Sequence, residues 1–94
     1  MRVSFGQTLE AGWSTTAIGQ ISAASRWRGR NGFVMEDERE AALEALKREA
    51  AEYGADGIIG VRFEADEVRN CEVEGMALTR MTATGMAVRI ARAA

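Results

Sequence analysis

The stretch from Glu36 to Phe63, EDEREAALEALKREAAEYGADGIIGVRF, constrains the fold most, because it predicts a helix that passes almost directly into a strand. Its first half is acidic at the start and strongly helix-favouring in its body. Gly54 stands where a left-handed helix C-cap is favoured, and the β-branched run at Ile58, Ile59 and Val61 follows after a short turn. We therefore expect one helix and one strand with almost no loop between them.

The predicted helix, residues 36–53, is amphipathic. Four apolar residues recur at spacings of three and four and form one stripe, with Ala42 beside it: Leu43, Leu46, Ala50 and Tyr53. Asp37 and Glu40 have the spacing of a capping box at its start. One face of this helix is therefore expected to pack on a sheet.

The residues before the helix predict one long strand from Thr16 to Arg26. Its alternation is imperfect, because Ile18 and Ile21 are out of phase by one residue. Gly19 lies between them and can supply a bulge that restores the register. The RGRNG segment at residues 28–32 has the chemistry of a loop.

Two strands are expected after the helix, and each has two distinct faces. In the first, period two separates Ile59, Val61, Phe63 and Ala65 from Ile58, Gly60, Arg62 and Glu64. The second, residues 77–91, has one face with Thr82, Thr84, Met86, Val88 and Ile90. Small residues occupy its other face: Ala83, Gly85 and Ala87. That small-residue face would admit close contact with a neighbouring surface.

These elements predict an α+β fold in the order strand, helix, strand, strand. We expect a single domain over residues 1–94, with residues 1–12 as an N-terminal arm. One helix covers one face of a three-stranded antiparallel sheet, and no other predicted element covers the opposite face. A sheet with free edges and an uncovered face favours association, and a chain of 94 residues has a marginal core of its own. We therefore expect a homo-oligomer.

Composition narrows the cellular setting and the partners. The start MRVSFGQTLE lacks the apolar segment of a secretory signal, and no apolar run reaches transmembrane length. Together with a single cysteine, Cys71, this predicts a cytoplasmic protein without a membrane partner. The net charge of −2 is not typical of a nucleic-acid binder, so nucleic acid is not an expected partner.

Three segments match the motifs of a known family. Ala42 to Asp56 follows the pattern A-L-x-x-L-x-x-E-A-x-x-x-G-A-(N/D), Gly60 to Arg62 follows V-G-V-R, and Gly85 to Val88 follows G-T-A-V. On these motifs the chain resembles the YbjQ-like family, which is labelled heavy-metal-binding. Two departures stand out: Gly29 to Phe33 is shorter than the family's glycine-rich segment, and Met86 replaces the closing threonine. The resemblance implies a dodecin-like subunit that assembles into a ring, commonly a pentamer.

The first candidate ligand site is the run from Arg26 to Arg30. Three arginines, Arg26, Arg28 and Arg30, flank Trp27 and can clamp a phosphate or stack on a planar ligand. The structural alternative is a loop whose tryptophan packs on a neighbour and whose arginines pair with acids of the helix. Both interpretations are open at the level of the sequence.

The second candidate is a metal site at Cys71. Acidic neighbours can join its thiolate, or several copies of Cys71 can converge on the axis of an oligomer. The alternative is a solvated acidic hairpin with an incidental cysteine, because soft metal sites want three or four thiolate or imidazole donors and the chain has no histidine.

Catalysis is not expected. No histidine is present to activate a serine, threonine or cysteine, and the acidic residues lie in polar runs where nothing raises a carboxyl pKa. The sequence therefore predicts a non-catalytic, cytoplasmic, homo-oligomeric binding or assembly module without a cofactor. The alternative function is a heavy-metal-binding or metal-response protein.

Overall fold

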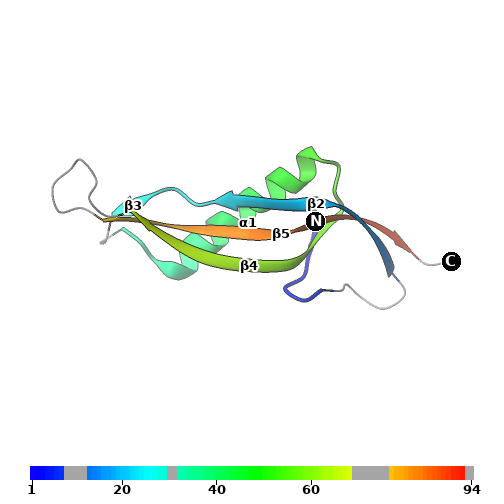
Figure 1. Ribbon diagram of the computed structural model, residues 1–94, viewed down its shortest axis with the longest axis horizontal. Helices are drawn as coiled ribbons and strands as arrows, with labels where there is room; N and C mark the ends of the chain where they lie inside the picture. The colour runs from blue at the N-terminus through cyan, green and yellow to red at the C-terminus, as the bar shows by residue number, and fades with distance from the viewer. Residues whose placement is uncertain (8–12, 30–31, 69–76, 93–94) are drawn as a thin grey trace.

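The computed structural model describes residues 1–7, 13–29, 32–68 and 77–92 of the chain. Its elements follow in the order β1 (Arg2–Val3), β2 (Trp13–Ala24), β3 (Arg28–Gly29), α1 (Met35–Glu52), β4 (Gly57–Val68) and β5 (Leu78–Arg92). Figure 1 shows α1 lying along one face of a long, narrow sheet. The expected α+β class is confirmed, with the helix and the sheet as its two layers.

Strand β5 is the centre of the sheet. It pairs antiparallel with β4 on one side and with β2 on the other, while β3 pairs with β5 and β1 pairs parallel with β4. The expected three-stranded antiparallel sheet is therefore not confirmed, because the described residues form a mixed sheet of five strands. β1 lies in the expected arm and β3 in the expected loop, and strands of two residues are too short to give a period-two signal.

The predicted bulge in β2 is confirmed. Ala17 pairs with Val88 and Gly19 pairs with Ala87, so the register shifts at Ile18. Past this point Ile21 faces the helix side and is 9% exposed. The extra residue in β2 thus brings the second isoleucine into the core.

A second bulge, in β4, changes which residues share a face. Gly60 has φ +63°, and the register with β5 shifts between Ile59 and Arg62. Ile58 and Val61 are both buried in the core although they are three positions apart. The expected alternation, which placed Ile58 on the same face as Arg62, is therefore wrong across Gly60, because the bulge inserts one residue into the pattern.

Helix α1 begins and ends within one residue of the expected bounds. Gly54 has φ +72°, which confirms the left-handed cap. The expected capping box is wrong: Val34 is the N-cap, it makes no side-chain cap hydrogen bond, and Asp37 lies inside the first turn. The acids of that turn still meet the positive end of the helix dipole.

No helix among the described residues is long and apolar enough to cross a membrane.

The core lies between α1 and the sheet. The helix contributes residues spaced by four: Ala42, Leu46 and Ala50. The sheet contributes a larger set: Ile21, Ile58, Val61, Met81, Ala83 and Ala87. Tyr53, which was expected in the apolar stripe, is the C-cap residue and is 55% exposed, because the helix ends before this residue reaches the sheet.

The small-residue face of β5 belongs to this core. Ala83 and Ala87 are fully buried, and Gly85 between them is buried too. The neighbouring surface that this face contacts is the protein's own helix. Its small side chains allow α1 to approach the sheet closely, so they are not free to contact another subunit.

The opposite side of the sheet, the open face, carries the polar residues of the three long strands. These are half-buried or exposed: Gln20, Ser22, Arg62, Thr82 and Thr84. Gln7 reaches this side next to Gly60, where an added Cβ would lie 3.1 Å from its Nε2 atom. The open face is therefore where polar side chains of the described residues gather.

Candidate functional site

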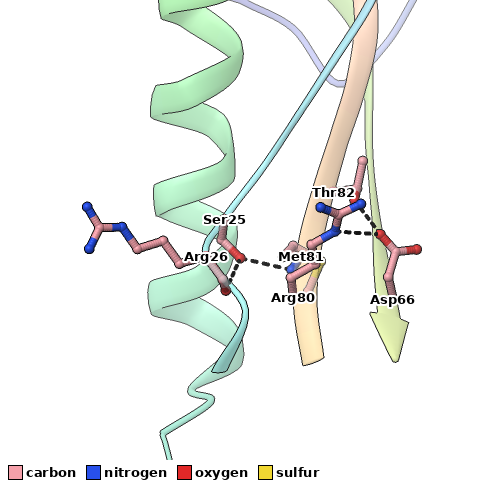
Figure 2. Close-up of polar contacts among 6 residues, drawn as sticks. All are labelled: Ser25, Arg26, Asp66, Arg80, Met81 and Thr82. Atoms are coloured by element: carbon pink, nitrogen blue, oxygen red, sulfur yellow. Dashed lines mark hydrogen bonds and ion pairs between the residues drawn. The ribbon is translucent and has the colours of Figure 1, made fainter. Parts of the chain in front are cut away.

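The predicted arginine–tryptophan segment lies at one end of the sheet, where β2 passes into β3. Ser25 anchors it to β5: its backbone N–H donates to the carbonyl of Met81 at 2.8 Å, and its Oγ accepts from the Met81 N–H at 2.9 Å. Figure 2 shows this contact and, on the neighbouring strands, a second polar cluster. The segment is thus fixed on the central strand.

Arg28 points to the helix rather than to a shared ligand position. Its Nε donates to Oε1 of Glu38 at 3.1 Å. Glu38 is 3% exposed, and its Oε2 has no hydrogen-bond partner among the described residues. Because a buried carboxylate needs a cation or several donors, Arg28 is engaged in stabilising Glu38. This ion pair matches the structural alternative stated for the segment.

Trp27 is packed against a cation from β5. The guanidinium of Arg80 lies 4.5 Å from the centroid of the Trp27 ring. Nε of Arg80 also lies 3.4 Å from Oδ2 of Asp66, and the hydroxyl of Thr82 donates to the same oxygen (Figure 2). One face of the tryptophan ring is therefore already occupied by a protein cation.

The described arginines of the segment do not converge. Arg26 is exposed, and Figure 2 shows its side chain directed away from Arg80 and Asp66. Arg28 is paired with Glu38, and Arg30 lies outside the described residues. The phosphate clamp of Arg26, Arg28 and Arg30 stays a prediction, and the contacts of Trp27 and Arg28 are structural ones.

We expect the substitution Arg28→Ala to lower the free energy of unfolding by about 1–3 kcal/mol, because it leaves the buried carboxylate of Glu38 without its cation. The matched control is Arg26→Ala, which removes the same charge from an exposed side chain and should change stability by less than about 0.5 kcal/mol. Urea denaturation measures both. Equal losses in the two variants would contradict the role given to Arg28.

A different site lies on the open face, farther along the sheet. It is an open pocket of about 260 Å³, here called the open-face pocket. Six side chains line it: Gln7, Gln20, Ile59, Arg62, Thr84 and Met86. Gly60 and Gly85 complete the lining.

The β-bulge and the strand register assemble this pocket. Arg62 pairs with Thr84 across β4 and β5, while Gln20 and Ile59 both pair with Met86. Residues paired in this way lie on the same face of a sheet. The bulge turns Ile59 and Arg62 to the open side while their neighbours enter the core, so that an apolar and a cationic side chain stand together.

The polar groups of the pocket are uncommitted among the described residues. The guanidinium of Arg62 makes no ion pair there, and the side chains of Gln7, Gln20 and Thr84 make no hydrogen bond there. The described lining residues therefore offer one positive charge, two amides and a hydroxyl beside the apolar side chains of Ile59 and Met86.

The described residues do not fit a heavy-metal site. Among them, no three histidine, cysteine, aspartate or glutamate side chains are grouped so that they could hold a metal ion. Cys71, the predicted metal ligand, lies outside the described residues. The carboxylates of Glu38 and Asp66 are already engaged by Arg28 and Arg80. Tight soft-metal sites use thiolate or imidazole donors, which these residues do not supply, and the methionine thioethers coordinate more weakly.

Sequence reasoning missed the open-face pocket. The sequence did indicate the part of the pocket that β5 supplies, because period two placed Thr84 and Met86 together on one face of the last strand. The signal for Arg62 and Ile59 was misleading, since the alternation put them on opposite faces. Their meeting depends on the bulge at Gly60.

The comparisons with known proteins agree with this fold. The chain matches the model of a protein family described as "Putative heavy-metal-binding" over residues 8–91. It is similar to a crystal structure of a protein of unknown function from the DUF74 family of Pediococcus pentosaceus, with 23% sequence identity and a TM-score of 0.65. That similarity covers 97% of this chain and 98% of the other chain. None of the curated proteins matches.

Proposed function

Since the chain belongs to the YbjQ family, whose description is heavy-metal-binding, we propose that it is a non-catalytic binding module that functions as a homo-oligomer in the cytoplasm. The proposed assembly is a ring of dodecin-like subunits, most simply a pentamer, as the resemblance to the family implies. The open-face pocket is the proposed binding element of each subunit.

The single observation that carries this proposal is the extended shape of one chain. Its radius of gyration is 15.8 Å, and its extents are 60 × 21 × 15 Å. A compact domain of this length has a radius of gyration of about 12 Å. A long, narrow molecule of only two layers has much surface for its volume. Its small core is therefore poorly enclosed by the rest of the chain.

The accessible surface leads to the same interpretation. One chain exposes 6479 Å², whereas a compact monomer of this mass exposes about 5,300 Å². The excess of about 1,200 Å² exceeds the roughly 800 Å² that each partner buries in a standard protein interface. Association would remove this extra surface from water.

The sheet offers a place for such contacts. β2 is the last strand of the sheet, and no strand lies on its outer side in the described part of the chain. An edge of this kind presents unpaired backbone donors and acceptors to another copy. A contact between unlike surfaces repeats from copy to copy and closes into a ring when the rotation allows it.

Native mass spectrometry across a range of protein concentrations tests the assembly. We expect a dominant species of about 51 kDa, five times the chain mass of 10.2 kDa. Light scattering in solution is the matched check. A monomer at all micromolar concentrations would contradict the homo-oligomer, and a closed species of another size would correct only the number of subunits.

The second candidate function is metal binding, which the family description favours. Cys71 is the only cysteine of the chain, which has no histidine, so its thiolate is the only soft ligand besides the more weakly coordinating methionines. We expect Cys71→Ser to leave zinc and copper binding unchanged, because one thiolate falls short of the three or four donors of a tight site.

Calorimetric titration of both proteins, with the oligomeric state checked, measures this. Stoichiometric sub-micromolar binding that disappears in the serine variant would favour the metal function instead, through convergence of several Cys71 side chains.

A further inference from the structure

We propose that the open-face pocket binds a small monoanionic carboxylate, with Arg62 holding the carboxylate group and Ile59 and Met86 contacting its apolar part. The proposal rests on the proposed binding function and names the ligand class of that same pocket. Arg62 is the only charged side chain among the described residues that line the pocket.

Arg62 differs from the arginines that the fold uses internally. Arg28 is paired with Glu38, and Arg80 is paired with Asp66 and lies over Trp27. Arg62 is exposed and makes no ion pair among the described residues. Its planar guanidinium is therefore available for a carboxylate, which it binds through two parallel hydrogen bonds.

The other polar groups of the pocket suit the same ligand. Gln7, Gln20 and Thr84 supply amide and hydroxyl donors, and no acidic side chain is among the described residues that line the pocket. Among these residues an anion therefore meets donors without a carboxylate that repels it. The few polar groups fix the orientation of a ligand whose remaining surface lies on apolar side chains.

The pocket favours a carboxylate over a phosphate. A phosphate carries close to two charges and is commonly held by several cations, a helix N-terminus or a group of backbone N–H donors. Among its described lining residues the open-face pocket has one cation, and the only described helix lies on the other face of the sheet. The net charge of −2 also disfavours a dianion.

The volume limits the ligand to a short chain. At about 260 Å³ the pocket is smaller than the 300–1,000 Å³ typical of pockets for larger organic ligands. Butyrate is a suitable probe because it joins a carboxylate to a short apolar chain. Butanamide has the same shape without the charge, and inorganic phosphate has the charge without the apolar part.

The test is a titration of the ¹⁵N-labelled protein with butyrate, butanamide and phosphate, followed by the backbone amide shifts of residues in the pocket. We expect saturable shifts with butyrate at Gln20, Arg62 and Thr84, and weaker binding of the other two probes. Arg62→Gln should weaken butyrate binding at least about tenfold, as the loss of a charged hydrogen-bond partner requires.

Arg48→Gln is the matched control, because it removes the same charge from an exposed position of α1, and it should leave butyrate binding within about twofold. Thr84→Val keeps a β-branched residue in β5, removes the hydroxyl, and should weaken binding by a few-fold.

Equal weakening by Arg62→Gln and Arg48→Gln would overturn the proposal, as would butanamide binding as tightly as butyrate. Tighter binding of phosphate would overturn the carboxylate assignment, and no saturable shift with any probe would overturn the site.

Native mass spectrometry of the same samples separates this proposal from the proposed oligomer. A ring that binds no butyrate contradicts the ligand assignment alone. A monomer that binds butyrate through Arg62 contradicts the homo-oligomer alone, because all the lining residues come from one chain.

Discussion

Replacing Leu46 with alanine is expected to lower the free energy of unfolding by about 2–5 kcal/mol. Leu46 is fully buried and is one of the largest fully buried side chains among the described residues. It lies in the middle of α1, between Ala42 and Ala50, so its neighbours on the helix are too small to fill the space that it leaves. The cost therefore includes both the lost burial and the cavity.

The control for this prediction is Leu43→Ala. Leu43 is in the same helix but only partly buried at the margin of the core, so the identical deletion should cost clearly less. Chemical denaturation at one fixed protein concentration measures both, because association also contributes to stability. A larger loss at Leu43 than at Leu46 would show that the helix packs by a different face.

Replacing Gly85 with alanine is expected to cost about 1–3 kcal/mol, although it adds a single methyl group. A Cβ at Gly85 would lie 2.6 Å from Cγ2 of Ile58 and 3.3 Å from the carbonyl oxygen of Ile59. Ile58 is fully buried and its branched side chain has no free space to move into. The strand β4 must therefore shift away from β5.

Gly19→Ala is the matched control, since Gly19 is also a strand glycine that pairs with β5. A Cβ there meets no atom within 4 Å, and alanine should leave the stability unchanged or raise it by up to about 1 kcal/mol. Thermal and urea denaturation of the two variants compare the positions. If Gly85→Ala were as stable as the parent, the close contact of β4 and β5 at this point would be excluded.

The helix shows how far local patterns reach. Its bounds followed from the acidic start, the spacing of Leu43 and Leu46 and the glycine at position 54, and all of these act within a few residues. The spacing of four between Ala42, Leu46 and Ala50 also reaches back to Glu38, which continues the buried stripe by one turn. The helix pattern alone did not indicate this burial, because it depends on the ion pair with Arg28 from β3, outside the helix.

The candidate site shows where local patterns end. The ligand site predicted from the sequence contains three adjacent residues, Arg26, Trp27 and Arg28. Their side chains point in different directions, with Trp27 against Arg80 and Arg28 against Glu38. The residues that form the pocket come from the N-terminus, β2, β4 and β5. Period two relates Thr84 and Met86 within β5, but no spacing in the sequence relates residues of different elements.

The sequence by itself determined the family, the α+β class, the helix and the three long strands, because periodicity and turn chemistry are properties of neighbouring residues. The tertiary structure alone decided which strand face α1 covers and which side chains share the open-face pocket. The physical reason is the bulge at Gly60, whose single extra residue changes the face of every side chain that follows it in β4. It turns Arg62 toward the open face and leaves Val61 in the core.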